Sequence, residues 1–230
     1  FGGCAARNVP VSKACAELMS KNYLEVVVAP YYEEGAVDIL RQRKNLRIVK
    51  IARIDRVREY APCRFVDFKS LMDGGLVVQQ SPLNRVKTAA DFLPAVGKDK
   101  IGEVKIARQP TQKEMDDLLF GWQVEQGITS NSVIFVKDGV TVGIGTGEQD
   151  RVGVVEIAIF KAYKKFADHL AFKKFGKLFF EVELMSAKGE VAKSEVEAIQ
   201  AEVKAKHGNL PGSAMVSDAF FPKRDAVDSG

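Results

Sequence analysis

The chain has 230 residues, of which 46% are hydrophobic and 28% charged, and its formal net charge is +4. This composition is typical of a soluble globular α/β protein with one large or two small domains, and it excludes disordered, collagen-like and solenoid chains. No apolar run approaches the roughly 20 residues that a membrane-spanning helix needs, so an integral membrane protein is excluded as well.

The cysteines and the first residues indicate the setting of the protein. Cys4, Cys15 and Cys63 form no CxxC pair, and an odd number of cysteines cannot all be bridged within one chain. We therefore expect a reduced, cytoplasmic protein. The chain opens on Phe1-Gly2-Gly3 instead of Met, so we expect a fragment or a processed product. Only two histidines are present, which excludes a histidine-rich metal site.

The basic residues are clustered. Eight of them, against one acid, lie between Arg41 and Arg58, and six lysines lie between Lys161 and Lys177. Aromatic side chains do not interleave with the first cluster as stacking platforms for bases would, so nucleic-acid binding is disfavoured. A solvated surface is the favoured interpretation, and a site for a small anionic substrate is the alternative.

The first 51 residues alternate between two patterns. Residues 11–22 and 31–44 have the spacing of helices, whereas residues 24–29 and 46–51 have the apolar composition of buried strands. This alternation predicts a parallel α/β sheet.

The middle of the chain is less regular. Residues 64–68 and 75–78 are predicted to be short strands around a turn at Gly74, and residues 81–105 are predicted to be mainly loop. We place a boundary near residue 108, which divides the chain into a first α/β segment, residues 1–108, and a second, residues 109–230.

The second segment begins with a clear helix signal. Thr111 and Glu114 have capping-box spacing and predict a helix that ends near Gln126. Residues 132–136 and 140–144 flank a Lys-Asp-Gly turn and predict a β-hairpin.

The rest of the second segment is predicted with one ambiguity. The stretch from residue 152 is rich in β-branched residues, yet we predict a buried helix of about 20 residues because the pattern continues into residue 165. Residues 173–184 are predicted to be a strand, residues 194–206 a helix and residues 208–212 a loop.

Three polar or glycine-rich motifs are candidates for function. Gly143-Ile144-Gly145-Thr146-Gly147 is either a structural turn or a loop facing an anion, and Arg151 after it is either a surface residue or a cation beside that loop. Thr129-Ser130-Asn131-Ser132 is a cap and turn, or else presents the Asn131 amide to a carbonyl oxygen during acyl transfer. In residues 217–225, Pro222 either bends the chain so that polar groups converge or merely separates a strand from a helix.

These segments together resemble the transformylase domain of the AICAR transformylase/IMP cyclohydrolase family, truncated at both ends. The matching segments, in chain order, are Phe1-Gly2-Gly3, Leu24-Glu25-Val26-Val27-Val28-Ala29-Pro30, Gly74-Gly75-Leu76-Val77-Val78-Gln79, Ser130-Asn131-Ser132-Val133, residues 142–149 with Arg151, and residues 217–222 with Arg224-Asp225. Their order and spacing make the match more specific than any one motif.

The resemblance implies a function and a fold. The family transfers a formyl group from 10-formyltetrahydrofolate to the amino group of AICAR in purine (IMP) biosynthesis. Its transformylase domain has cytidine-deaminase-like α/β/α layers in two fused subdomains, without zinc. The resemblance further implies a homodimer, a nucleotide and a folate as ligands, no metal site in this chain, and potassium as a candidate cofactor.

The resemblance also implies roles for individual residues. Asn131 would be catalytic, orienting the formyl oxygen. Substrate contacts would come from Gly2, Glu25, Arg151 and Phe220. Folate contacts would come from Pro222, Lys223 and Asp225. Glu25 stands where relatives have Asp, and Lys223 where many have Phe.

One expected element is missing from the sequence. A Lys–His pair that assists deprotonation of the amine in this family precedes the segment matched by Phe1-Gly2, and neither His169 nor His207 takes its place. We therefore expect that this chain alone is inactive, and the alternative function is a non-catalytic nucleotide- or folate-binding module that keeps the scaffold.

Overall fold

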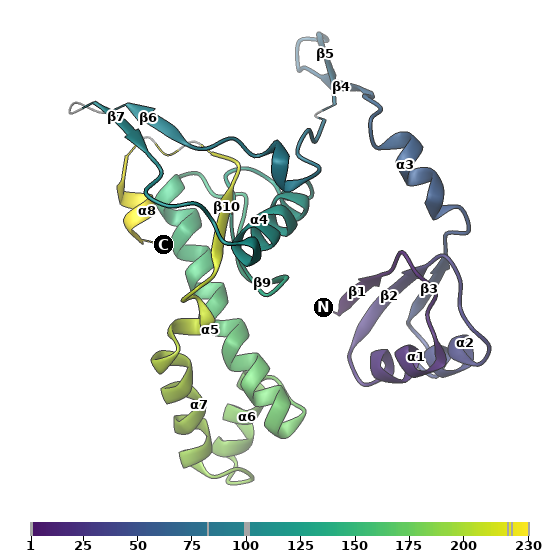
Figure 1. Cartoon of the computed structure of the whole chain (residues 1–230). Helices are drawn as coiled ribbons and strands as arrows, with labels where there is room; N and C mark the ends of the chain where they lie inside the picture. The colour runs from purple at the N-terminus through teal and green to yellow at the C-terminus, as the bar shows by residue number, and fades with distance from the viewer. Residues whose placement is uncertain (1, 82, 99–101, 220, 222, 230) are drawn as a thin grey trace. The chain divides into compact units, whose positions relative to one another are not determined.

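The structure is a computed structural model that describes residues 2–81, 83–98, 102–219, 221 and 223–229. The chain forms two compact units, residues 1–83 and residues 84–230, and each is described by itself (Figure 1). The boundary differs from the one placed near residue 108. The reason is that Asn84 accepts a hydrogen bond from Trp122 Nε1 at 3.0 Å and Val86 O accepts one from Gln123, which ties this stretch to the second unit.

The first unit contains the predicted parallel sheet. Strands β1 (Gly3–Ala6), β2 (Leu24–Ala29) and β3 (Arg47–Lys50) pair side by side in that order, and all are parallel. Helices α1 (Lys13–Ser20) and α2 (Ala36–Arg41) bury Ala16 and Leu40 together with Val27 of the central strand.

The helix predicted at residues 31–44 is shorter than expected. Tyr32 donates its hydroxyl to the carbonyls of Val27 and Val49, at 2.9 Å each, and Glu33 N donates to Val11 O. These bonds hold Tyr32 and Glu33 outside any helix and a turn follows at residues 34–35, so α2 begins only after Gly35, whose φ of +76° suits glycine.

The remaining elements of the first unit form no buried core. A 3₁₀ turn (Ile54–Arg56) leads into α3 (Val57–Tyr60), and β4 (Val66–Ser70) pairs antiparallel with β5 (Leu76–Gln80). The hairpin confirms the predicted turn at Gly74, and all side chains of both strands are exposed.

The second unit begins with small elements that the sequence did not predict. A 3₁₀ turn (Ala89–Asp91) is followed by a short hairpin of β6 (Val96–Lys98) and β7 (Glu103–Lys105). Helix α4 (Gln112–Glu125) then starts as predicted, because Thr111 Oγ1 accepts from Glu114 N at 3.3 Å and Glu114 accepts from Thr111 N at 2.8 Å.

The central sheet of the second unit is antiparallel and is packed by helices on both faces. Its strands are β8 (Val133–Lys137), β9 (Val140–Gly145) and β10 (Ala214–Ser217), in the spatial order β10-β8-β9. Alternate residues of β8 point to opposite faces: Ile134 packs toward α4, and Phe135 packs toward the long helix α5 (Arg151–Phe175). The fold is therefore mixed α/β, and the cytidine-deaminase-like arrangement of layers stays a prediction.

The C-terminal half of α5 continues into a helical layer with α6 (Phe179–Ala187) and α7 (Lys193–Ala205), visible beside it in Figure 1. A 3₁₀ turn (His207–Asn209) and the short α8 (Asp225–Ser229) complete the unit. The helices predicted from residue 152 and over residues 194–206 are confirmed. The strand predicted over residues 173–184 is wrong, because Phe175, Phe179 and Val182 pack against the helices of this layer and Gly176 ends α5 with φ +65°.

The glycines of β9 set how closely α5 approaches the sheet. A Cβ at Gly143 would lie 2.2 Å from the carbonyl oxygen of Ala158, and one at Gly145 would lie 2.1 Å from that of Val154. The positive φ of Gly147, +69°, then turns the chain toward α5. This arrangement supports the structural interpretation of the glycine motif for its first two glycines.

Within the described ranges, no helix is long and apolar enough to cross a membrane. The three cysteines are free; Cys4 and Cys63 are exposed and Cys15 is half-buried.

We expect Gly145→Ala to lower the free energy of unfolding by about 2–3 kcal/mol, because the new methyl group would overlap a backbone carbonyl that cannot rotate away. Gly97→Ala is the matched control, since nothing lies within 4 Å of its Cβ position, and it should change stability by less than about 0.5 kcal/mol. Urea unfolding followed by circular dichroism measures both values. Equal effects of the two substitutions would contradict the close-packing explanation.

Candidate functional site

Two of the predicted substrate-binding residues meet in the first unit. Gly2 N donates a 2.6 Å hydrogen bond to Glu25 Oε1 at the start of β2. A Cβ on residue 2 would lie 2.8 Å from Glu25 Cγ and 2.7 Å from the Tyr23 ring, so any other residue would have to displace these side chains. The carboxylate of Glu25 is half-buried, and its orientation is fixed by the backbone.

The predicted residues of the second unit gather around the guanidinium of Arg151. This residue begins α5, and its side chain is only 9% exposed. Its Nη1 donates to Asp218 Oδ1 at 2.7 Å, to Ser217 Oγ at 3.0 Å and to Ser132 O at 3.1 Å. Arg151 is therefore neither a surface residue nor a free cation: it joins three separate segments of the chain.

The second nitrogen of the same guanidinium reaches the predicted catalytic residue. Arg151 Nη2 donates to Asn131 Oδ1 at 3.0 Å and also to the carbonyl of Ala219. The ring of Phe221 lies 5.2 Å from the guanidinium carbon, a cation–π distance. The Nε–H of Arg151 is buried and has no partner among the residues that the structure describes.

Asn131 is held at both ends of its amide. While Oδ1 accepts from Arg151, Nδ2 donates to the carbonyl of Glu148 at 2.9 Å. This arrangement uses one of the two N–H groups of Nδ2, and no partner of the other is found within the described part of the chain. Asn131 is half-buried, so an amide N–H in fixed orientation is available near the surface.

Sheet register explains why Asp218 reaches this cluster. Ser217 pairs with Val133 in the antiparallel β10–β8 ladder, so Asp218 lies opposite Ser132. Its carboxylate accepts from Ser132 N at 3.1 Å and from the Ser130 hydroxyl, as well as from Arg151. Partial burial raises the pKa of Asp218, but the hydrogen bonds from Ser130 and Arg151 outweigh it and hold the pKa at about 2.

The structure adds a residue that the sequence analysis missed. Glu125, the last residue of α4, is 8% exposed and accepts a hydrogen bond from the Ser132 hydroxyl. Its Oε2 is buried without a partner among the described residues. Burial raises the pKa of Glu125, and the hydrogen bond from Ser132 opposes this only in part. Glutamate at a helix end carries no pattern that would mark it as part of a site.

The predicted folate-binding segment is described only in part. Phe220 and Pro222 lie outside the described residues. Lys223 is exposed, and Asp225 begins α8, where its Oδ1 accepts from Ala226 N at 2.8 Å. The structure thus brings together Asn131 with Arg151, and Gly2 with Glu25, in two separate units.

The donor set of the cluster suits an organic ligand that is held by hydrogen bonds. Amide, hydroxyl, carboxylate and guanidinium groups meet here within one network. In the described ranges, no three His, Cys, Asp or Glu residues are placed to hold a metal ion together.

The chain is similar to known proteins over most or all of its length. A family model described as "AICARFT/IMPCHase bienzyme" matches residues 1–161. The chain is 36% identical to the bifunctional purine biosynthesis protein PurH of Caldicellulosiruptor bescii over 229 residues, which is 100% of this chain and 33% of that protein. It is 39% identical to PurH of Thermoanaerobacter sp. over 165 residues, 72% of this chain and 29% of that protein. The chain therefore spans about a third of the length of these relatives.

We expect Asp218→Asn to lower stability at pH 7 by about 1–2 kcal/mol, because the pKa of Asp218 falls from its ordinary 3.8 to about 2 on folding. This contribution is present above pH 3.8 and is lost as the pH falls toward 2, so the two proteins should converge in acid. Asp228→Asn removes an exposed ion pair with Arg224 and should cost less than about 0.5 kcal/mol. Chemical unfolding from pH 2 to 7 tests this; a constant difference would contradict it.

The pH dependence of stability that Glu125 causes has the opposite sign to that of Asp218. Its pKa is raised on folding above the ordinary 4.5, so the folded state binds more protons and wild-type stability falls as the pH rises past 4.5. Glu125→Gln removes this loss, so the stability of the variant relative to the wild type should increase as the pH rises past 4.5, as measured by thermal unfolding. Glu156→Gln, at an exposed position on α5, is the control and should change stability little. A pH-independent difference for Glu125→Gln would contradict the assignment.

Proposed function

Because this chain belongs to the AICARFT/IMPCHase bienzyme family, we propose that it forms part of a purine-biosynthesis enzyme that transfers a formyl group from 10-formyltetrahydrofolate to AICAR. The family model describes a bienzyme, so family membership supports a role in purine biosynthesis but does not distinguish between the two activities. The geometry of the site is needed for that distinction. The observation that favours formyl transfer is the Asn131 amide, whose orientation is fixed by Arg151 and Glu148.

Formyl transfer is an acyl transfer. The amine of the substrate attacks the formyl carbon, and negative charge develops on the formyl oxygen before the folate nitrogen leaves. A preoriented N–H donor stabilises that charge, because the donor needs no reorganisation during the reaction. In our proposal the remaining Nδ2 hydrogen of Asn131 supplies this donor.

Arg151 acts in this proposal as a positioning residue. Its Nη2 fixes Asn131 Oδ1, and its ion pair with Asp218 fixes the guanidinium in turn. Since the pKa of Asp218 is about 2, this ion pair stays charged throughout the neutral range. The direct contact with the substrate base that the resemblance implies would use the Nε–H of Arg151, which has no partner among the described residues, or would require a ligand group to replace one of the protein partners of Arg151.

The nucleotide side of the proposal rests on Gly2 and Glu25. A carboxylate can accept hydrogen bonds from two adjacent hydroxyls, as a ribose offers. Glu25 Oε1 already accepts from Gly2 N, which orients the carboxylate and leaves lone pairs on both oxygens for a ligand.

The remaining parts of the proposal come from the resemblance. They are base contact by Phe220, folate contacts by Pro222, Lys223 and Asp225, a homodimer, and a cytoplasmic location. Potassium remains a candidate cofactor, and no step of the proposed mechanism uses it.

We expect Asn131→Ala to lower kcat for formyl transfer by about 10²–10³-fold, the usual effect of removing one donor to a developing oxyanion. The assay is turnover of AICAR and 10-formyltetrahydrofolate by a protein of the relatives' full length that contains this chain. Asn45→Ala, at an exposed position in the turn before β3, is the control and should leave kcat unchanged.

Two outcomes would contradict the proposal. Normal turnover by the Asn131→Ala protein would remove the assigned role of Asn131. Binding of AICAR or folate without any turnover, by a full-length protein with an intact Lys–His pair, would support the non-catalytic binding module instead.

A further inference from the structure

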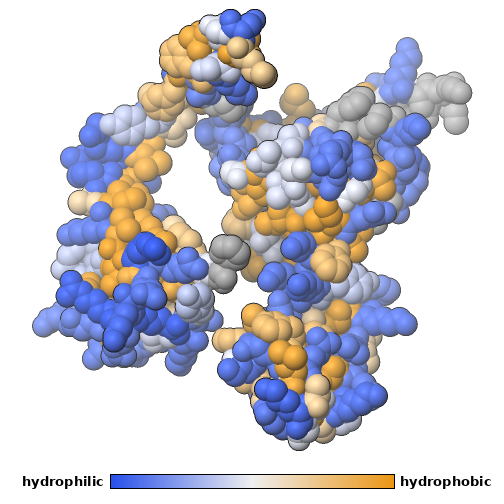
Figure 2. Space-filling model, turned by 180° about the vertical axis from the view of Figure 1, so that it is seen from behind, coloured by the Kyte–Doolittle hydropathy of each residue, from blue (hydrophilic) through white to orange (hydrophobic). Residues whose placement is uncertain are grey.

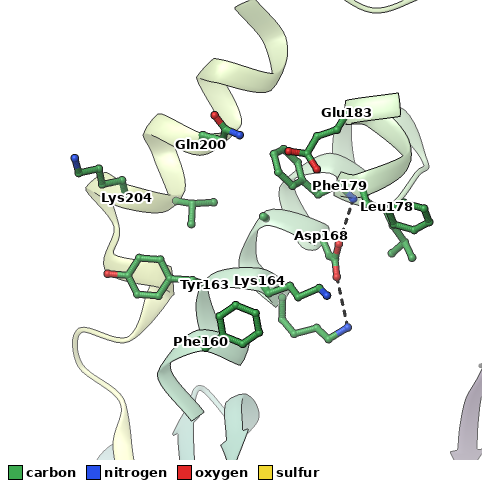
Figure 3. Close-up of a pocket in the computed structure, with 13 residues that line it drawn as sticks. Phe160, Tyr163, Lys164, Asp168, Leu178, Phe179, Glu183, Gln200 and Lys204 are labelled. Carbon is green, nitrogen blue, oxygen red and sulfur yellow. Dashed lines mark hydrogen bonds and ion pairs between the residues drawn. The ribbon is translucent and has the colours of Figure 1, made fainter. Parts of the chain in front are cut away.

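A cavity of about 790 Å³ lies in the helical layer of the second unit, away from the Arg151 cluster. Its walls come from α5, α6 and α7 (Figure 3). At 1.5 Å per residue, Phe160 and Asp168 lie roughly 14 Å and 25 Å along α5 from Arg151. The cavity is therefore distinct from the site to which we assign formyl transfer.

The walls of the cavity expose large hydrophobic side chains. Phe160 is 61% exposed, Phe180 56% and Leu178 43%, although they come from two different helices. Figure 2 shows hydrophobic side chains at the surface of this layer among hydrophilic ones. Exposed apolar groups that converge on one concavity are typical of a ligand site, and the volume lies in the range of small-molecule pockets.

Some polar side chains that line the cavity form ion pairs or hydrogen bonds, and others have no ion-pair partner among the described residues. Asp168 accepts from Phe179 N at 3.2 Å, at the start of α6, and forms an ion pair with Lys165 at 3.4 Å. The hydrogen bond from Phe179 N joins α6 to α5, and the ion pair with Lys165 balances the charge of Asp168 within α5. Lys164 and Lys204 have no ion-pair partner within the described residues, and Glu183 is the one lining carboxylate in the same situation.

The unpaired groups lie at different places around the cavity. Figure 3 shows Lys164 extending along the cavity beside Asp168, whereas Gln200 and Glu183 point toward each other from α7 and α6 at the other end. The ammonium group of Lys164 thus lies on the side of the cavity lined by Phe160, and the free carboxylate of Glu183 lies at the other end. That combination complements a molecule with an apolar body and a negatively charged end.

We propose that this cavity binds a soluble amphipathic anion, a small molecule with one apolar body and one carboxylate or phosphate group. The apolar body packs against Phe160, Tyr163 and Phe180, and the anionic group lies beside Lys164. The proposal does not depend on formyl transfer, because none of these residues belongs to the Arg151 cluster.

Isothermal titration of the 230-residue chain with monomeric dodecanoate tests the binding, with dodecanol as the uncharged probe of equal length. We expect saturable binding of one dodecanoate per chain and at least about threefold weaker binding of dodecanol, the effect of one partly exposed ion pair. Absence of saturable binding, or equal affinity for both probes, would overturn the proposal.

Two pairs of variants locate the site. Lys164→Gln should weaken dodecanoate binding about three- to fivefold, whereas Lys161→Gln, outside the lining of the cavity on the same helix, should not. Phe160→Ser should weaken binding about tenfold through lost apolar contact, whereas Phe172→Ser, also exposed on α5 but outside the lining, should not. Circular dichroism checks that all four variants are folded; controls as damaging as the cavity variants would overturn the assignment.

Two further measurements distinguish the proposed ligand from two other occupants of this surface, a second copy of the chain and a membrane. Light scattering after size exclusion would reveal a dimer that Phe160→Ser dissociates, which would make the cavity an interface between two copies instead. Binding to phosphatidylglycerol vesicles without binding of monomeric dodecanoate would assign the surface to a membrane. Either result would overturn the proposal.

Discussion

The candidate site of the second unit depends on one partly buried ion pair, between Arg151 and Asp218. Arg151 begins α5, Asp218 follows β10, and the turn before β8 donates to Asp218 and accepts from Arg151. Removing two charges from water is costly, and only good geometry with further hydrogen bonds offsets that cost. The planar guanidinium meets this requirement through five hydrogen bonds, which a lysine could not replace. The orientation of Asn131 follows from this pair.

Local signals in the sequence predicted much of the scaffold. The capping box at Thr111 and the turn at Asp138-Gly139 can be predicted from neighbouring residues, and both are confirmed. The prediction for residues 173–184 is wrong because a run of bulky apolar residues is equally compatible with a strand and a buried helix. The packing of Phe175, Phe179 and Val182 against other helices favours the helix, and these are contacts between separate elements. Periodicity within a segment cannot contain such information.

Individual residues of the site can be predicted from the sequence, but their arrangement in space cannot. Asn131 and Arg151 were both candidates, yet their meeting with Asp218 depends on the register of β10 against β8, more than 80 residues apart in the chain. Glu125 could not be predicted as a site residue. Its role depends on its burial, and the sequence does not show that a glutamate at a helix end is buried. Among the glycines, Gly143 and Gly145 fit both a structural turn and a ligand loop in the sequence, and the structure places them where the α5 backbone crosses the sheet. Spacing alone does not separate close packing from ligand approach.

The length of α5 has a consequence for the modularity of the second unit. One uninterrupted helix of 25 residues supplies Arg151 at its first turn, the packing surface for β9 in its middle, and a wall of the helical layer toward its end. No linker separates the sheet from that layer along α5, so the layer cannot be excised or exchanged as an independent piece at this connection. A recombination that kept the sheet but replaced the layer would have to splice one helix onto another in phase, at about 100° per residue.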